Sequence, residues 1–146
     1  MGSDKAIENL GQDEALKLAA TASVGRVVYS RYAMPAVHLV NFKLDGKDVV
    51  FKTRKGAKFG AAVADTVVAF EVDEVDEATH SGWTVTLTGR SSLVTAPAEQ
   101  ERLAGLGIDT WLPDREYFIK VRTQVIAGRR IQRRDLMGDD VADEAC

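Results

Sequence analysis

The sequence predicts a mainly β fold of the α+β class, an antiparallel barrel with helices packed outside it. Segments with strand character outnumber helical segments, and a tight-turn signal joins two of the strands as a hairpin. The glycine-rich phosphate loops of βαβ nucleotide folds are missing from the sequence. An antiparallel barrel accommodates this order of elements better than a parallel sheet does.

One domain is expected from a chain of 146 residues. We expect residues 10–134 to form this domain. Residues 1–9 and 135–146 are expected to be flexible tails, because the two ends are polar and have no hydrophobic periodicity.

The composition excludes several classes of protein. A net charge of −3 gives no general attraction to nucleic acid or to anionic membranes. No apolar stretch approaches the ~20 residues of a membrane span. The single cysteine, Cys146, cannot form an intrachain disulfide, which favours a cytoplasmic location. Together with His38 and His80 it fits no zinc spacing, so we expect no metal.

The first expected element is a helix over residues 13–22. Asp13 is a plausible N-cap, small and apolar residues share one face, and Gly25 closes the segment. A short run with strand character follows over residues 26–31.

A hairpin is expected next, because residues 36–44 and 48–53 read as strands on either side of Asp45-Gly46. An Asp-Gly pair tolerates the positive φ angles of a tight turn. The alanine-rich segment 56–64 after this hairpin is expected to be helical.

The second half begins with a buried strand at residues 66–72, and the acidic run 73–77 reads as a solvated strand end and loop. Residues 83–95 alternate as a strand in which Val85, Leu87 and Gly89 share one face. The remaining expected elements are a helix over 98–106 after Pro97 and two strands over 117–122 and 125–131.

Basic side chains gather where the second hairpin strand ends and a helix begins. A phosphate favours such a place, because backbone N–H groups and cationic side chains converge there. The alternative is a solvated basic loop. The residues concerned are Lys52, Thr53, Arg54, Lys55 and Lys58.

The strand at 36–44 carries the next candidates. Alternation puts Val37, Leu39 and Asn41 on one face, and His38, Val40 and Phe42 on the other. Asn41 on a mainly apolar face needs a hydrogen-bond partner, either a cofactor ring edge or a backbone group. His38 is interpreted as an ordinary, partly buried histidine.

Trp83 follows a glycine at a strand start, where it could stack on a planar ligand or pack in the core. No serine–histidine–aspartate or cysteine–histidine set can be assembled, and the sequence identifies no catalytic residue. If the protein is an enzyme, a cofactor is expected to carry the chemistry.

Six segments in order make residues 10–132 similar to the pyridoxamine 5′-phosphate oxidase-like family of the flavin-binding split-barrel superfamily. No single segment is decisive, but their order makes coincidence improbable. They are Gly25-Arg26-Val27, the strand from Pro35 to Asn41, the turn from Phe51 to Lys58, Phe70-Glu71-Val72-Asp73, Ser81 to Val85 with Gly89-Arg90, and Gly128 to Ile131.

The resemblance implies a six-stranded antiparallel split β-barrel with flanking helices, and a homodimer with FMN at the subunit interface. It places Val40 and Asn41 beside the isoalloxazine ring and Trp83 near that ring. It also places Phe51, Lys52 and Thr53 along the ribityl edge and Lys58 at the phosphate.

The chain departs from the family pattern in the turn and near the C-terminus. Ala57 stands where the family turn often has a threonine or serine, and Phe59 follows Lys58 in place of a second basic residue. The true oxidases also carry an Arg-x-His element near the C-terminus, whereas this chain has no histidine after His80. We therefore do not expect oxidation of vitamin B6 phosphates.

The function that the resemblance implies is an FMN-binding oxidoreductase with a small-molecule redox substrate that the sequence does not identify. One alternative is an F420-dependent reductase, and another is a non-catalytic flavin-binding or stress protein. FMN is favoured because the acidic tail of F420 needs an extended cationic track. Arg129 and Arg130 cannot both contribute to such a track, because alternation sends them to opposite faces of the last strand.

Overall fold

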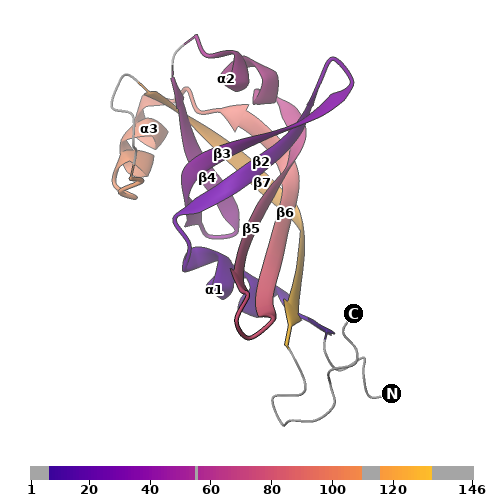
Figure 1. The fold of residues 1–146 in the computed structure, drawn as a ribbon. Helices are drawn as coiled ribbons and strands as arrows, with labels where there is room; N and C mark the ends of the chain where they lie inside the picture. The colour runs from indigo at the N-terminus through magenta and orange to yellow at the C-terminus, as the bar shows by residue number, and fades with distance from the viewer. Residues whose placement is uncertain (1–6, 55, 110–115, 133–146) are drawn as a thin grey trace, which may run out of the picture.

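The computed structural model describes residues 7–54, 56–109 and 116–132, which contain seven strands and three helices (Figure 1). All of the strands belong to one antiparallel sheet. In chain order the elements are β1 (Ile7–Asn9), α1 (Gln12–Ala20), β2 (Val24–Arg31), β3 (Met34–Asp45), β4 (Asp48–Arg54), α2 (Lys58–Val63), β5 (Thr66–Asp76), β6 (Ser81–Leu93), α3 (Pro97–Ala104) and β7 (Glu116–Ile131).

The sheet closes on itself as a barrel of six strands. The strand order is β1-β7-β4-β3-β2-β5-β6, and a further pairing of β7 with β6 completes the ring from β2 to β7. The expected antiparallel split barrel with flanking helices is confirmed. β1 pairs with the end of β7 outside this ring, so residues 7–9 of the expected N-terminal tail belong to the sheet.

Two short pairings make the barrel split. β3 and β4 pair only from Phe42↔Phe51 to the turn at Gly46, and β2 and β5 pair over three residues, from Arg26↔Glu71 to Val28↔Ala69. β3 pairs instead with β2 beyond Phe42, so β3 and β4 diverge there. The divergence leaves the end of β4 without β3 beside it.

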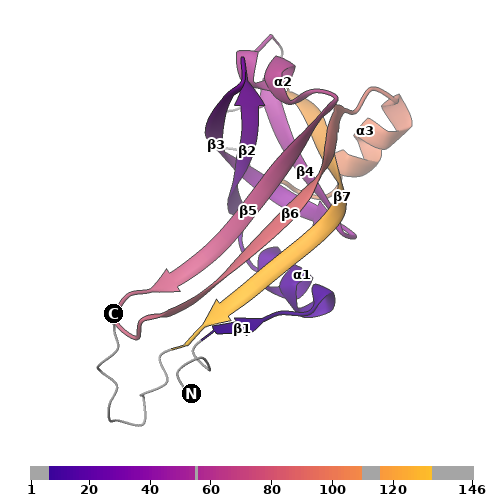
Figure 2. The ribbon, with the colours of Figure 1, turned by 90° about the vertical axis from the view of Figure 1, so that its right-hand side faces the viewer.

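Strand alternation directs a continuous set of apolar side chains into the barrel. α1 contributes Ala15 and Ala19 at one end, α2 contributes Phe59 and Val63 at the other, and α3 packs outside the wall (Figures 1 and 2). The strand residues of this interior are Val27, Val40, Phe42, Val49, Phe51, Val68, Phe70, Val72, Val85, Leu87, Ile119 and Val121.

The two expected C-terminal strands are one strand, β7, with an irregularity at its centre. Thr88 pairs with Val125 and Gly89 with Thr123, so Gln124 is an extra residue on β7. This bulge reverses the phase of alternation and lets both halves face the barrel correctly. Because the inward-facing positions shift by one residue at Gln124, the sequence pattern resembles two separate strands.

The expected loop at residues 73–77 is also mostly strand, because β5 continues to Asp76 opposite Ser81 of β6. Carboxylates on a strand raise no conflict where one of its faces is open to solvent. Gly25, expected to close the first helix, lies within β2, where a Cβ atom would fall 2.3 Å from the ring of Phe70.

Candidate functional site

The end of β4 and the start of α2 form the basic turn that the sequence singles out. Thr53 points into the barrel and is only 7% exposed. Within the described part of the chain its Oγ1 has no hydrogen-bond partner. Gly60 of α2 covers it so closely that a Cβ atom there would lie 2.8 Å from Thr53 Oγ1. A buried hydroxyl without a partner is costly, and this one lies beneath α2, next to the basic residues of the turn.

The cationic side chains of this turn are open to solvent. Arg54 ends β4 and Lys58 begins α2, and both residues are exposed. Gly56 between them has φ +79°, a left-handed conformation that glycine adopts without strain. Lys55 lies outside the described residues. The turn can therefore present cations to an external anion, as a phosphate site requires.

Phe51 and Lys52 face opposite sides of β4. The Phe51 ring is fully buried in the barrel and contacts the rings of Phe59 and Phe70. The Lys52 side chain lies on the outer side, with its Nζ 5.6 Å from the centre of the Phe118 ring. For Phe51, therefore, only the backbone could line a site at this edge.

β3 supplies Val40 and Asn41 with the expected alternation. Val40 is buried in the barrel, whereas Asn41 is half-buried on the outer face opposite Val24 of β2. The His38 ring stacks on Phe59 of α2, with ring centres 3.8 Å apart and planes 8° from parallel. Burial lowers the pKa of His38 below its ordinary value, which favours the neutral imidazole.

Trp83 lies far from this turn within one chain. Ser91 Oγ of β6 donates to the carbonyl oxygen of Val63 at the end of α2. Trp83 is eight residues earlier on β6, about 26 Å away along the strand. The structure thus brings Thr53, Lys58 and the β3 residues to one end of the barrel and places Trp83 towards the other.

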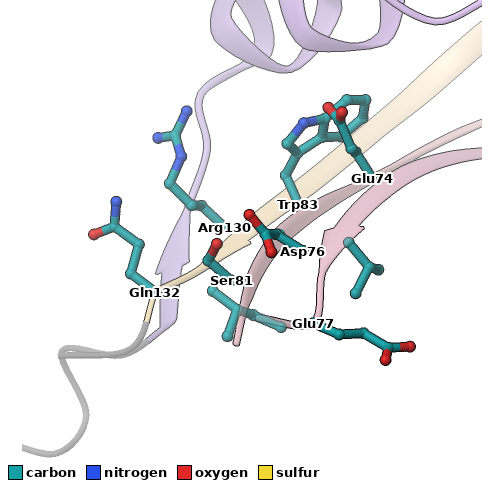
Figure 3. A pocket seen from close by; sticks show the side chains of 10 residues that line it. Glu74, Asp76, Glu77, Ser81, Trp83, Arg130 and Gln132 are labelled. Carbon is teal, nitrogen blue, oxygen red and sulfur yellow. The ribbon is translucent and has the colours of Figure 1, made fainter. Parts of the chain in front are cut away.

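Trp83 borders an open cavity of about 490 Å³ at the free end of the β5–β6 hairpin (Figure 3). Glu74, Asp76 and Glu77 of the hairpin give its wall a negative character. Arg130 on the opposite side is paired with Glu8 at 3.5 Å and with Glu14 at 2.9 Å. The Trp83 ring also packs against the core, which agrees with the core-packing alternative given for this residue in the sequence analysis.

The outer face of β2, β3, β5, β6 and β7 carries a mostly apolar row of side chains that the described helices do not cover. Strand register aligns Val37, Val28, Ala69, Thr88 and Val125 in one row across these five strands. Figure 2 shows β5, β6 and β7 side by side with the helices at the margins. The exposed fractions are 63% for Val37, 53% for Leu39, 55% for Val67 and 59% for Val125. Monomeric proteins seldom leave large contiguous patches of this kind exposed.

A polar cluster lies in the next two rows of the same face. Arg26 Nη1 is 3.2 Å from Glu71 Oε1 and 3.2 Å from Asp73 Oδ2. Thr84 Oγ1 donates to Glu71 Oε2 at 3.1 Å. Sequence reasoning gave these residues no role, although all of them lie in the segments that carry the family resemblance. Only strand pairing shows that they meet.

None of the helices in the described part of the chain has the length and hydrophobicity of a transmembrane segment. Across residues 7–54, 56–109 and 116–132, no three histidine, cysteine, aspartate or glutamate side chains gather as metal ligands would.

Comparison with known proteins identifies the family. Residues 11–131 match the model of the pyridoxamine 5′-phosphate oxidase family. The uncharacterized protein Rv0080 of Mycobacterium tuberculosis is 33% identical over 135 residues, which cover 88% of each chain.

Solved structures agree with this match. A FAD-binding protein from Mycobacterium smegmatis has a TM-score of 0.76 and 26% identity, covering 86% of this chain and 100% of that one. A conserved protein of unknown function from Corynebacterium diphtheriae has a TM-score of 0.75 and 30% identity, covering 86% of this chain and 98% of that one. The family match spans both the barrel and the basic turn, and the chain therefore belongs to the pyridoxamine 5′-phosphate oxidase family.

Proposed function

We propose that the protein is a homodimeric flavin-binding oxidoreductase that binds FMN at the turn between β4 and α2 and acts on a small-molecule redox substrate. The observation that carries the proposal is that two features occur in the same turn. Thr53 Oγ1 is buried without a hydrogen-bond partner among the described residues, and the cationic residues Arg54 and Lys58 are exposed. The flavin would supply the electron transfer. The chain would bind its phosphate and orient its ring.

The geometry of the turn supports phosphate binding. Lys58 and Arg54 offer charge-assisted hydrogen bonds, and Thr53 offers a hydroxyl donor that lacks a partner. Lys52, Thr53 and Arg54 also extend beyond the last β3–β4 pair, Phe42↔Phe51. Backbone groups on that edge of β4 can therefore bind a ligand.

FMN is favoured over F420 because the other cationic cluster is remote. Thr53 pairs with Tyr117 of β7, and Arg129 is twelve residues further along that strand, about 40 Å away. Arg130 is engaged by Glu8 and Glu14. Within one chain these arginines cannot continue the turn into a track for an acidic tail.

Two features support the proposed homodimer. The uncovered apolar row with Val37 and Val125 needs a partner surface, and a second copy supplies one with the same character. Contact between Trp83 and a flavin at the turn requires the partner subunit's Trp83, since the distance along β6 is about 26 Å.

Titration of the apo protein with FMN, followed by flavin fluorescence, tests the site. Replacing Lys58 with alanine removes a charge-assisted hydrogen bond and should weaken FMN binding about tenfold to a hundredfold. The same variant should bind riboflavin as the wild type does, because riboflavin has no phosphate. His38→Ala is the matched control and should weaken FMN binding less.

Equal FMN dissociation constants for the Lys58 and His38 variants would refute the assignment of Lys58 to the phosphate site. FAD and F420 belong in the same titration at low and high salt. F420 binding that is tighter than FMN binding and weakens steeply with salt would show that F420, and not FMN, is the cofactor. Tighter FAD binding would extend the site to the ligand that the Mycobacterium smegmatis protein binds. Failure of all three to bind would favour the non-catalytic alternative.

A further inference from the structure

We propose that the Arg26–Glu71–Asp73 cluster is the polar centre of the surface that receives a second copy of this chain, and that Glu71 takes up a proton when the copies associate. The inference rests on the proposed homodimer and adds its contact surface and a proton linkage.

The position of the cluster carries the first step. Arg26 pairs across the strands with Leu39 of β3 and with Glu71 of β5, so all three lie in one row of the outer face. The neighbouring row holds Val37 and Val125, both more than half exposed. A partner that covers the apolar row must also cover the cluster.

The charges in the cluster do not balance. One arginine faces two carboxylates, and the side chains of Glu71 and Asp73 are only 25% and 30% exposed. In the described part of β6 the groups beside Glu71 are neutral hydroxyls: Thr84 donates to Glu71, and Thr86 is opposite Glu71 in the register. Arg129 of β7 is opposite Thr84 in the register, two strands from Asp73 and about 10 Å across the sheet.

Association therefore has an electrostatic cost that one proton per chain removes. Burial and the neighbouring Asp73 carboxylate already raise the pKa of Glu71 in the single chain. Covering the cluster withdraws more water and raises that pKa further. The dimer then holds more protons than two separate chains, and the association strengthens as the pH falls. The protonated state leaves Arg26 and Asp73 as a balanced pair.

Sedimentation equilibrium of the full chain at several pH values tests this inference. Between about pH 7.5 and about pH 5.5, the dissociation constant of the wild-type dimer should fall at least about tenfold. Glu71→Gln keeps the shape of the side chain and removes its charge. This variant should dimerise more tightly at the higher pH and lose most of the pH dependence.

Glu74→Gln is the matched control, because Glu74 is on the same strand but borders the Trp83 cavity. It should retain the wild-type pH dependence. Asp73→Asn gives a second measurement if Glu71→Gln does not fold, since it also balances the cluster and should weaken the pH dependence.

The outcomes separate the two proposals. A wild-type chain that stays monomeric at every pH would refute the homodimer. A dimer whose dissociation constant does not change with pH would overturn the proton linkage and leave the homodimer standing. Unchanged pH dependence in both Glu71→Gln and Asp73→Asn would show that other groups take up the proton.

Discussion

The Thr53 and Thr123 hydroxyls are chemically alike but are located at different ends of the barrel. Both Oγ1 atoms are buried without a hydrogen-bond partner among the described residues. Thr53 lies under α2, whereas Thr123 lies on β7 beside Asp48, whose Oδ1 accepts a hydrogen bond from the Thr123 backbone N–H at 3.1 Å. Only Thr53 adjoins the basic turn.

Replacing Thr53 with valine should stabilise the apo protein and weaken FMN binding. Valine has nearly the same shape and removes a hydroxyl whose burial without a partner costs about 1–3 kcal/mol. The bound phosphate or ribityl chain would lose a donor at the same time. Urea unfolding of the apo protein and FMN titration measure the two effects.

Thr123→Val is the control for this prediction. It should stabilise the fold in the same way and leave the FMN dissociation constant unchanged, because β7 carries Thr123 six residues beyond Tyr117, the partner of Thr53. If Thr53→Val and Thr123→Val affected FMN binding equally, the Thr53 hydroxyl would have no role in the site.

The longest element, β7, depends on a bulge for its orientation. Without the bulge at Gln124, regular alternation from buried Thr123 would turn Val125 inward and Ile126 outward. The bulge instead leaves Val125 exposed for a partner and packs Ile126 against the core. Gly89 permits this geometry, because a Cβ atom there would fall 2.0 Å from the carbonyl oxygen of Arg122.

Replacing Gly89 with alanine should therefore destabilise the protein by about 2–3 kcal/mol, because the obstructing atom is backbone and cannot rotate away. Thermal or urea unfolding measures the loss. Ser92→Ala, at an exposed position of β6 that also pairs with β7, should cost less than about 0.5 kcal/mol. Equal costs at the two positions would contradict the role given to Gly89.

The β3–β4 hairpin is tied to α3 by charge. Arg102 donates to both carboxylate oxygens of Asp45, at 3.2 and 2.7 Å, and Lys120 lies 3.0 Å from Asp45. The hydrogen bonds from Arg102 and then from Lys120 hold the pKa of Asp45 well below its usual range. These ion pairs hold α3 against β4 and β7 and leave the row with Val37 and Val125 uncovered.

At the scale of the whole molecule, the described helices leave one broad side of the sheet uncovered, the outer face of β2, β3, β5, β6 and β7, and this is the side we assign to the partner. Introducing lysine at both Val37 and Val125 should give a folded monomer, since exposed residues contribute little to the core and buried lysines oppose association. Sedimentation equilibrium measures the oligomeric state, and circular dichroism confirms folding.

The control is Ile7→Lys, which changes an exposed apolar residue of β1, away from the row that Val37 and Val125 share. This variant should remain dimeric. If the Val37/Val125 double variant also remained dimeric, the subunits would meet through another face.

The sequence by itself determined the fold class and most of the elements. The Asp45-Gly46 turn, the alternation of Val85 and Leu87, and Pro97 at a helix start are local signals, and each element forms where they predict it. The sequence also located the basic turn at Lys58, because the residues of that turn are neighbours in the chain.

Only the tertiary structure decided which distant residues meet. It joined the two expected C-terminal strands through the bulge at Gln124, extended β5 through the acidic run, and placed Trp83 away from the turn. It also brought Arg26 and Glu71 together and left Val37 and Val125 uncovered on one face. The reason is physical: alternation tells which residues of a strand share a face, but the register between strands depends on the closure of the whole barrel.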